Sequence, residues 1–196
     1  MPTEIRIYFE GDKLLKPGFD AFFDEIKKRT REKRCSFRLV AGGSGELACR
    51  DFAIALREHP DSWNILLRDS EGPVGPDASA SLCRQHRWDP VHADSIFWMV
   101  EMMEAWFHAD KSALQNFYKS GFKADALKAN PKVEQIPKKD LERGLSEATR
   151  KTPKGNYYDH KTSHGPALLA SLNPTLVRNA APNCQKLFEA ILTGLA

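Results

Sequence analysis

The stretch Asn64-Ile65-Leu66-Leu67-Arg68-Asp69-Ser70-Glu71-Gly72-Pro73 decides the fold that the sequence predicts. Its apolar run ends in two acidic residues and is then stopped by Gly-Pro, a pattern typical of a buried strand that leads into a turn. Alternate residues of a strand point to the same side, so we expect Asp69 and Glu71 to project together from its carboxyl end. That edge is where open α/β sheets bind their ligands.

Two carboxylates placed side by side repel each other, and a bound cation is a common reason for tolerating them. Mg²⁺ in proteins takes oxygen ligands from one or two carboxylates and keeps several waters. The pattern therefore indicates a divalent metal site at Asp69 and Glu71. A solvated turn that carries acidic residues is the simpler interpretation of this stretch taken alone.

The neighbouring segments predict strands that alternate with helices. Residues 5–9 and 36–40 have strand character, residues 19–29 and 46–58 show helical spacing of apolar side chains, and residues 95–100 predict a fourth strand. This order is typical of an α/β fold with a mostly parallel sheet and right-handed crossovers. All carboxyl ends then share one edge, so we expect Glu10, which follows the first strand, to lie beside Asp69 and Glu71.

The second half of the chain is expected to be mainly helical. A helix over residues 101–110 would bury its Met and aromatic side chains and point Glu104, in its first turn, toward the other carboxylates. Residues 138–149 predict another helix, residues 155–165 a polar loop, and residues 168–172 and 186–195 short helices. We expect an α/β core over residues 1–110 and a basic helical extension over residues 111–196, packed on that core as one compact unit.

Charge is distributed unevenly along the chain. The 196 residues carry a net charge of +3, but residues 111–161 contain twelve Lys or Arg against six Asp or Glu, a balance of +6 that leaves −3 elsewhere. A basic half that faces acidic metal ligands suits a phosphodiester backbone. Solvated helix faces are the other common location of Lys-rich stretches.

Composition bears on the compartment. The chain is 41% hydrophobic and 28% charged, which is ordinary for a globular protein. No apolar run is long enough to cross a bilayer, and the first residues enter a strand pattern without a signal-peptide core. The four cysteines show no CxxC spacing, so neither a zinc ribbon nor a disulfide framework is indicated. We expect a cytoplasmic protein that does not act at a membrane.

A glycine-rich turn follows the second predicted strand. The segment Gly43-Ser44-Gly45-Glu46-Leu47-Ala48 fits a loose GxGxxA dinucleotide pattern, which normally follows the first strand of its fold. We expect instead that Gly43 and Ser44 bring backbone amides near a phosphate or the metal site. A purely structural turn is the commonest explanation of such a segment.

Histidines with a possible ligand spacing lie in the expected loop. His160 and His164 have the i, i+4 spacing of a zinc pair but lack the acid of the HExxH motif. Contact of Lys161 or His164 with a phosphate is the functional interpretation that we favour over zinc. A loop held by hydrogen bonds is the structural alternative.

Several of these blocks resemble a TOPRIM domain, the metal-binding fold of topoisomerases, primases and OLD-family nucleases. The resemblance rests on Glu10-Gly11 after the first strand and Asp69-Ser70-Glu71 after the third. The blocks at residues 103–110, 134–138 and 155–165 are similar to a family of small bacterial TOPRIM-like proteins of unknown function. Members are often encoded beside an ABC-type or AAA ATPase in anti-phage loci, and Glu104-Ala105-Trp106 is similar to a Glu-Trp pair in RloB-like relatives.

The resemblance implies Mg²⁺ or Mn²⁺ chemistry on nucleic acid, either DNA or RNA. Glu10 would be a metal ligand or general base, and Asp69 and Glu71 would be the acidic pair. Glu104 and Asp110 would complete a second metal position, because two ions about 3.5–4 Å apart can activate water and stabilise the leaving oxygen. Lys161 would neutralise charge on the phosphorane.

The function implied by the resemblance is a metal-dependent nuclease that acts as effector of an ATPase-controlled anti-phage defence system. The DxE pair departs from the usual TOPRIM DxD pair by one methylene, which changes the ligand geometry. A non-catalytic regulatory subunit that docks an ATPase through the same sheet edge is the alternative. A nucleotide-binding enzyme that uses Gly42 to Gly45 is a third hypothesis.

Overall fold

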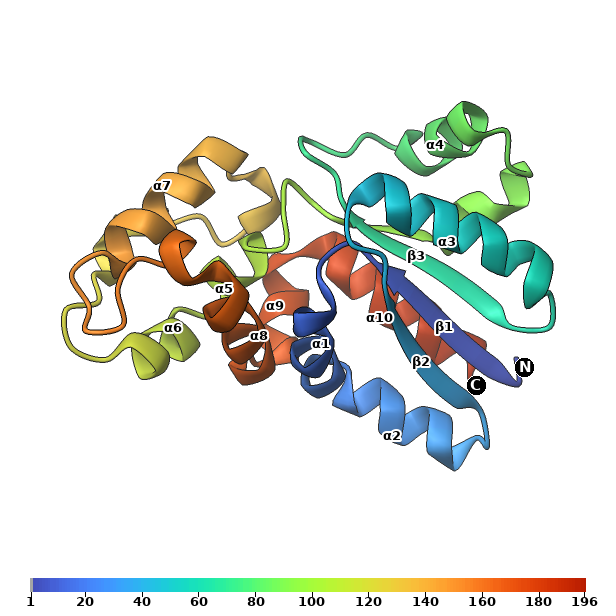
Figure 1. The fold of residues 1–196 in the computed structure, drawn as a ribbon, viewed down its shortest axis with the longest axis horizontal. Coiled ribbons are helices and arrows are strands. Elements are labelled where there is room, and N and C mark those ends of the chain that lie inside the picture. The colour runs from blue at the N-terminus through green and yellow to red at the C-terminus, as the bar shows by residue number, and fades with distance from the viewer. Residues whose placement is uncertain (1) are drawn as a thin grey trace.

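The computed structural model describes residues 2–196 as a parallel four-stranded sheet flanked by helices (Figure 1). The strands are β1 (Glu4–Phe9), β2 (Ser36–Ala41), β3 (Trp63–Asp69) and β4 (Ile96–Met99), in the spatial order β2-β1-β3-β4. Every neighbouring pair is parallel. The predicted α/β fold with its parallel sheet is confirmed.

Helices connect the strands and then continue beyond them. The connecting helices are α1 (Lys16–Phe22), α2 (Asp24–Glu32), α3 (Gly45–Glu58) and α4 (Ala78–His86). The later helices are α5 (Ala105–Ala109), α6 (Lys111–Tyr118), α7 (Lys138–Thr149), α8 (Lys161–Ser171), α9 (Pro174–Ala180) and α10 (Pro182–Gly194). Within residues 2–196, none of these helices combines the length and the apolar character that crossing a bilayer requires.

Side-chain alternation along the strands divides the core into two layers. Ile7 and Phe9 of β1 pack in the layer that includes α1, α2 and α10, whereas Tyr8 packs in the layer formed by α3 and α4. Figure 1 shows α3 and α10 on opposite faces of the sheet. Because both faces are covered, the middle of β3 is a continuous apolar run, Ile65-Leu66-Leu67, and all three side chains are buried.

The strand order places a topological switch point between β1 and β3. From β1 the chain passes through α1 and α2 to β2, toward one edge of the sheet. From β3 it passes through α4 to β4, toward the opposite edge. Loops at the carboxyl ends of these two strands therefore diverge and leave a crevice, the usual ligand position in open α/β sheets. Glu10 and Asp69 occupy the ends of these two strands.

The part of the chain after residue 110 shares its core with the part before it. One cluster of buried side chains runs from Ile5 in β1 to Leu195 beyond α10. Helices α6, α7 and α8 lie beyond the carboxyl ends of the strands, and α10 returns to pack on the sheet (Figure 1). The basic segment of the chain is thus placed at the same edge as the acids.

Two predicted helices differ from the observed ones. The helix expected over residues 19–29 is divided at Phe23, so α1 and α2 both turn apolar residues inward and Phe22 and Phe23 are both buried. The helix expected over residues 101–110 begins only at Ala105, because the chain bends at Glu101, where φ is +65°, and turns at residues 103–104 before the helix starts.

The loop expected over residues 155–165 is partly wrong. Helix α8 begins at Lys161 and continues through Gly165-Pro166, a pair that normally predicts a break. Close packing on α1 explains the difference, since a Cβ at Gly18 would lie 2.7 Å from the Pro166 carbonyl oxygen. This contact between helices favours the helical backbone over the local preference of the sequence.

We expect Gly42→Ala to destabilise the fold by about 1–3 kcal/mol, the usual effect of overpacking a filled core. A Cβ at Gly42 would lie 2.5 Å from the Ala48 Cα at the start of α3, and backbone cannot move aside as a side chain can. Urea denaturation measures the change. Gly75→Ala is the control, because no atom lies within 4 Å of its Cβ position; equal midpoints for the two variants would contradict the packing argument.

Candidate metal centre

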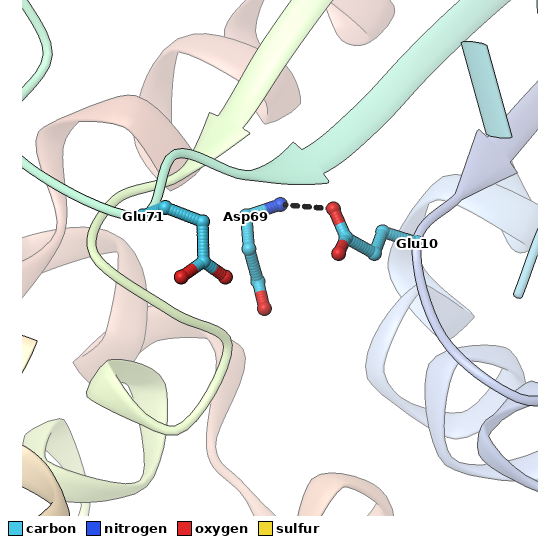
Figure 2. Close-up of side chains that lie close together, drawn as sticks. All are labelled: Glu10, Asp69 and Glu71. Atoms are coloured by element: carbon cyan, nitrogen blue, oxygen red, sulfur yellow. Dashed lines mark hydrogen bonds between the residues drawn. The ribbon is translucent and has the colours of Figure 1, made fainter. Parts of the chain in front are cut away.

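Three carboxylates converge at the crevice. Glu10, Asp69 and Glu71 each offer an oxygen, and these oxygens lie within 4.8 Å of one another. Figure 2 shows Asp69 between the other two side chains. Within residues 2–196 this is the only group of three or more His, Cys, Asp or Glu residues with such spacing. The structure therefore brings together the acids that follow β1 and β3 in the sequence.

Glu71 reaches the group by a route that strand alternation does not describe. Strand β3 ends at Asp69, and Glu71 lies in a turn with φ +58°. Its N–H donates to the Glu101 carbonyl oxygen at 3.2 Å, and the Glu101 N–H donates to Ser70 Oγ at 2.8 Å. A left-handed backbone at a residue other than glycine costs on the order of 1 kcal/mol or more, and such strain is common at functional sites.

Glu10 is held by the backbone of the neighbouring strand and by a partly buried arginine. Its Oε2 accepts a hydrogen bond from the Asp69 N–H at 3.2 Å (Figure 2) and lies 3.9 Å from Arg68 Nε. Burial raises the pKa of Glu10, and the Arg68 guanidinium opposes that rise. Arg68, an unusual residue for a buried strand, is thus a cation that helps to keep Glu10 ionised.

The absence of a side chain at Gly45 leaves space for Glu10 and Arg68. A Cβ there would lie 2.8 Å from Glu10 Oε2 and 2.8 Å from Arg68 Nη2. The Gly-rich turn therefore makes room for the Glu10 carboxylate. Gly43, with φ +73°, lines a pocket that Glu10 and Asp69 also line. Ser44 caps α3 by accepting a hydrogen bond from the Leu47 N–H.

Asp69 lies at the centre of the group, and its ionised form is strongly disfavoured. Burial raises its pKa well above the ordinary carboxyl value, and the charges of Glu104, Glu10 and Glu71 raise it further. A hydrogen bond from the Met103 N–H to Asp69 Oδ1, 2.9 Å long, lowers it in part. A bound cation would favour the ionised form that the surrounding carboxylates disfavour.

Glu104 lies in a pocket beside these acids. The pocket has a volume of about 270 Å³, and its lining includes Glu10, Asp69, Glu104 and Lys161. Glu104 is 1% exposed, and its Oε1 accepts a hydrogen bond from the Tyr157 hydroxyl at 2.8 Å and contacts Lys161 Nζ at 2.7 Å. Glu104 and Lys161 are therefore placed next to the acidic cluster, as the sequence suggested.

Asp110 does not join the cluster. Its Oδ1 accepts from the Ala113 N–H at 3.0 Å and caps α6, and its Oδ2 accepts from the Asn173 N–H at 2.9 Å. With both oxygens engaged in holding helix starts together, Asp110 has a structural role. The expectation that it completes a second metal position is wrong for this structure.

His164 also lies outside the pocket lining. Its Nδ1 pairs with the Tyr118 hydroxyl at 3.0 Å, and burial lowers its pKa, so the ring is uncharged at neutral pH. An uncharged ring away from the acids is a poor phosphate ligand. The His160 ring stacks at a tilt 5.1 Å from the His164 ring, and no third ligand joins this pair within residues 2–196.

Two residues that contact the acids were not singled out from the sequence. Tyr157 donates to Glu104, and Lys138 forms an ion pair with Glu71. A signal for Lys138 exists, since it is the first residue of α7 and a lysine is unfavourable at the positive end of a helix dipole. Such a lysine predicts a carboxylate partner without saying which one. Tyr157 carries no comparable signal.

The chemistry of the donor set fits a hard divalent cation. All three candidate ligands are carboxylates, with no histidine or cysteine among them, and Mg²⁺ and Mn²⁺ prefer such oxygen ligands. A cation would also offset the repulsion that the partly buried Asp69 experiences from the neighbouring carboxylates. The residues present therefore fit Mg²⁺ or Mn²⁺ at Glu10, Asp69 and Glu71.

Fold and site define an α/β protein with an acidic pocket at the switch point of a parallel sheet. The chain belongs to the family described as Domain of unknown function (DUF4276), which it matches over residues 12–192. This range includes Asp69, Glu71 and Glu104 and begins just after Glu10. No curated protein and no solved structure matches the chain. The TOPRIM resemblance stays a prediction.

We expect Asp69→Asn to raise the melting temperature of the metal-free protein at neutral pH. The pKa of Asp69 is raised on folding, so its contribution to stability is complete in acid and is lost as the pH rises through the raised pKa. The amide keeps the Oδ1 acceptor for the Met103 N–H but cannot ionise. Thermal melts across pH test this: the gain should vanish in acid, and Asp61→Asn, at an exposed position, should show none.

Proposed function

We propose that the protein is a metal-dependent phosphodiesterase that cleaves nucleic acid. The observation that supports this most strongly is the convergence of Glu10, Asp69 and Glu71 at the switch point of the sheet. Carboxylate clusters that hold Mg²⁺ or Mn²⁺ are a recurrent solution for phosphodiester hydrolysis. A bound ion would supply the positive charge that activates water and offsets the charge on the phosphate.

The protein's own residues have distinct tasks in this proposal. Glu10, Asp69 and Glu71 would hold the ion, and Arg68 keeps Glu10 ionised and oriented. Lys161, whose side chain is half exposed, lines the pocket and brings an ammonium group to its rim. There it can contact a phosphate oxygen, while the Tyr157 hydroxyl keeps the buried Glu104 carboxylate in place.

The class of substrate follows from charge. The basic balance of residues 111–161 lies on elements near the acidic edge, and lysines of that segment contact the acids themselves. A polyanionic backbone is attracted by such a segment, and the metal ligands then face its phosphates. We place this activity in the cytoplasm, where the four free buried cysteines would stay reduced. A partner ATPase stays a prediction.

Substitutions at the acids test the proposal. We expect Asp69→Asn and Glu10→Gln each to weaken Mn²⁺ binding by at least about tenfold, since losing even an outer-shell partner commonly costs 10–100-fold. Cleavage of plasmid DNA or single-stranded RNA in Mn²⁺ should fall to background in both variants. Glu58→Gln, at an exposed position at the end of α3, is the control and should keep both properties.

A thermal-shift titration with Mn²⁺ separates the alternatives. An ion that binds only the folded state adds about 2.7 kcal/mol at a concentration 100 times its Kd. Stabilisation without cleavage of any nucleic acid would favour the non-catalytic regulatory subunit. If Mn²⁺ stabilises neither the wild type nor the variants, the acidic cluster is not a metal site and the proposal fails.

A further inference from the structure

Glu71 carries a positive partner from the basic half of the chain. Lys138 Nζ forms an ion pair with Glu71 Oε2, and the Lys138 side chain is 32% exposed. The neighbouring Lys139 is exposed and has no ion pair within residues 2–196. The two adjacent lysines therefore differ in one respect that matters for the site: only Lys138 neutralises a candidate metal ligand.

A buried carboxylate fixes the position of Lys138. Glu101 is 6% exposed, and its Oε2 accepts a hydrogen bond from the Lys138 N–H at 2.9 Å. The backbone of Glu101 bonds to Glu71 and Ser70, as described above. One residue thus joins the first residue of α7 to the turn that carries Glu71. Both Glu101 and Glu71 have positive φ, so strained backbone is retained to build this junction.

The ion pair and a bound metal compete for the Glu71 carboxylate. An ammonium on Glu71 Oε2 occupies one of the lone pairs that a cation would use, and it repels a divalent ion at ligand distance. A bound ion therefore weakens the pair between Lys138 and Glu71, while the junction at Glu101 keeps the Lys138 backbone beside the site. The strongest partner for an ammonium group held there is an anionic oxygen of the substrate.

We propose, on the basis of the function proposed above, that Lys138 is a phosphate-binding residue that exchanges partners. It pairs with Glu71 in the absence of metal and substrate, and it contacts a phosphate oxygen of the substrate when Glu71 holds the ion. Metal and phosphodiester then assist each other, because the phosphate gives Lys138 a partner in place of the carboxylate that the metal takes. Removing the ammonium should strengthen metal binding and weaken the reaction.

The test compares Lys138→Met with Lys139→Met. Calorimetric titration with Mn²⁺ alone should show about tenfold tighter binding to Lys138→Met than to the wild type, the effect of removing one nearby positive charge. Turnover of bis(p-nitrophenyl) phosphate at saturating Mn²⁺ should fall about tenfold in kcat/KM for the same variant. Lys139→Met should match the wild type in both measurements.

Opposite changes in the two measurements distinguish exchange from a structural ion pair. Every side-chain variant keeps the Lys138 N–H that docks α7 on Glu101, and Lys138→Gln, which retains a polar side chain, provides a second folded variant with the same expectation. Mn²⁺ affinity that falls or stays unchanged in both Lys138 variants would overturn the exchange while leaving the proposed function intact. A wild type that binds no Mn²⁺ would overturn both.

Discussion

Repulsion among carboxylates at the carboxyl edge of the sheet is the constraint to which the rest of the structure responds. Two parallel strands deliver Glu10 and Asp69 to the same crevice, and the turn after β3 adds Glu71. Without compensation these charges would oppose folding, and they add to the rise in the pKa of Asp69 that burial causes. The surrounding residues reduce it by donating backbone N–H groups and by placing cations nearby.

The compensating cations come from different parts of the chain. Arg68 is local, since it precedes Asp69 in β3 and its guanidinium faces Glu10. Lys138 and Lys161 are distant in sequence and reach Glu71 and Glu104 from the first residues of α7 and α8. Each lysine is the first residue of a helix, where the helix dipole disfavours a positive charge. The carboxylate partner of each lysine supplies the negative charge that offsets this effect. Lysines from the basic segment, residues 111–161, thus pair with carboxylates that come earlier in the chain.

The main features of the fold could be predicted from the sequence because they depend on local patterns. Apolar runs ended by acids or glycines marked the strands, and their alternation with helices led to a parallel sheet whose carboxyl edge gathers Glu10 and Asp69. The bounds of α8 could not be predicted, because Gly165-Pro166 lies within a helix that packs closely on Gly18 of α1, a contact that no local pattern reveals. The interruption at Phe23 likewise depends on burying neighbouring aromatic residues in one core.

Candidate site residues divide in the same way. Acids at strand ends were identified because topology alone brings them together, whereas Asp110 was misjudged because its oxygens bond to helix starts that no local pattern reveals. Glu71 does lie beside Asp69, but not because alternate residues of one strand point to the same side. Strand β3 ends at Asp69, and the positive φ of Glu71 directs its side chain toward the other acids. Tyr157 and Lys138 contact the acids only through long-range packing, which spacing in one sequence does not encode.

During synthesis, the acidic residues of the site are made before the lysines that pair with them. The acids at the ends of β1 and β3 come earlier in the chain than the lysines that begin α7 and α8, and α10, which packs on one face of the sheet, follows all of them. A nascent chain therefore lacks the lysines that pair with Glu71 and Glu104, and one sheet face is covered only by α1 and α2, until α7, α8 and α10 emerge. Contacts of such long range form late, so the ribosome-bound intermediate is the stage at which this protein most needs protection from aggregation.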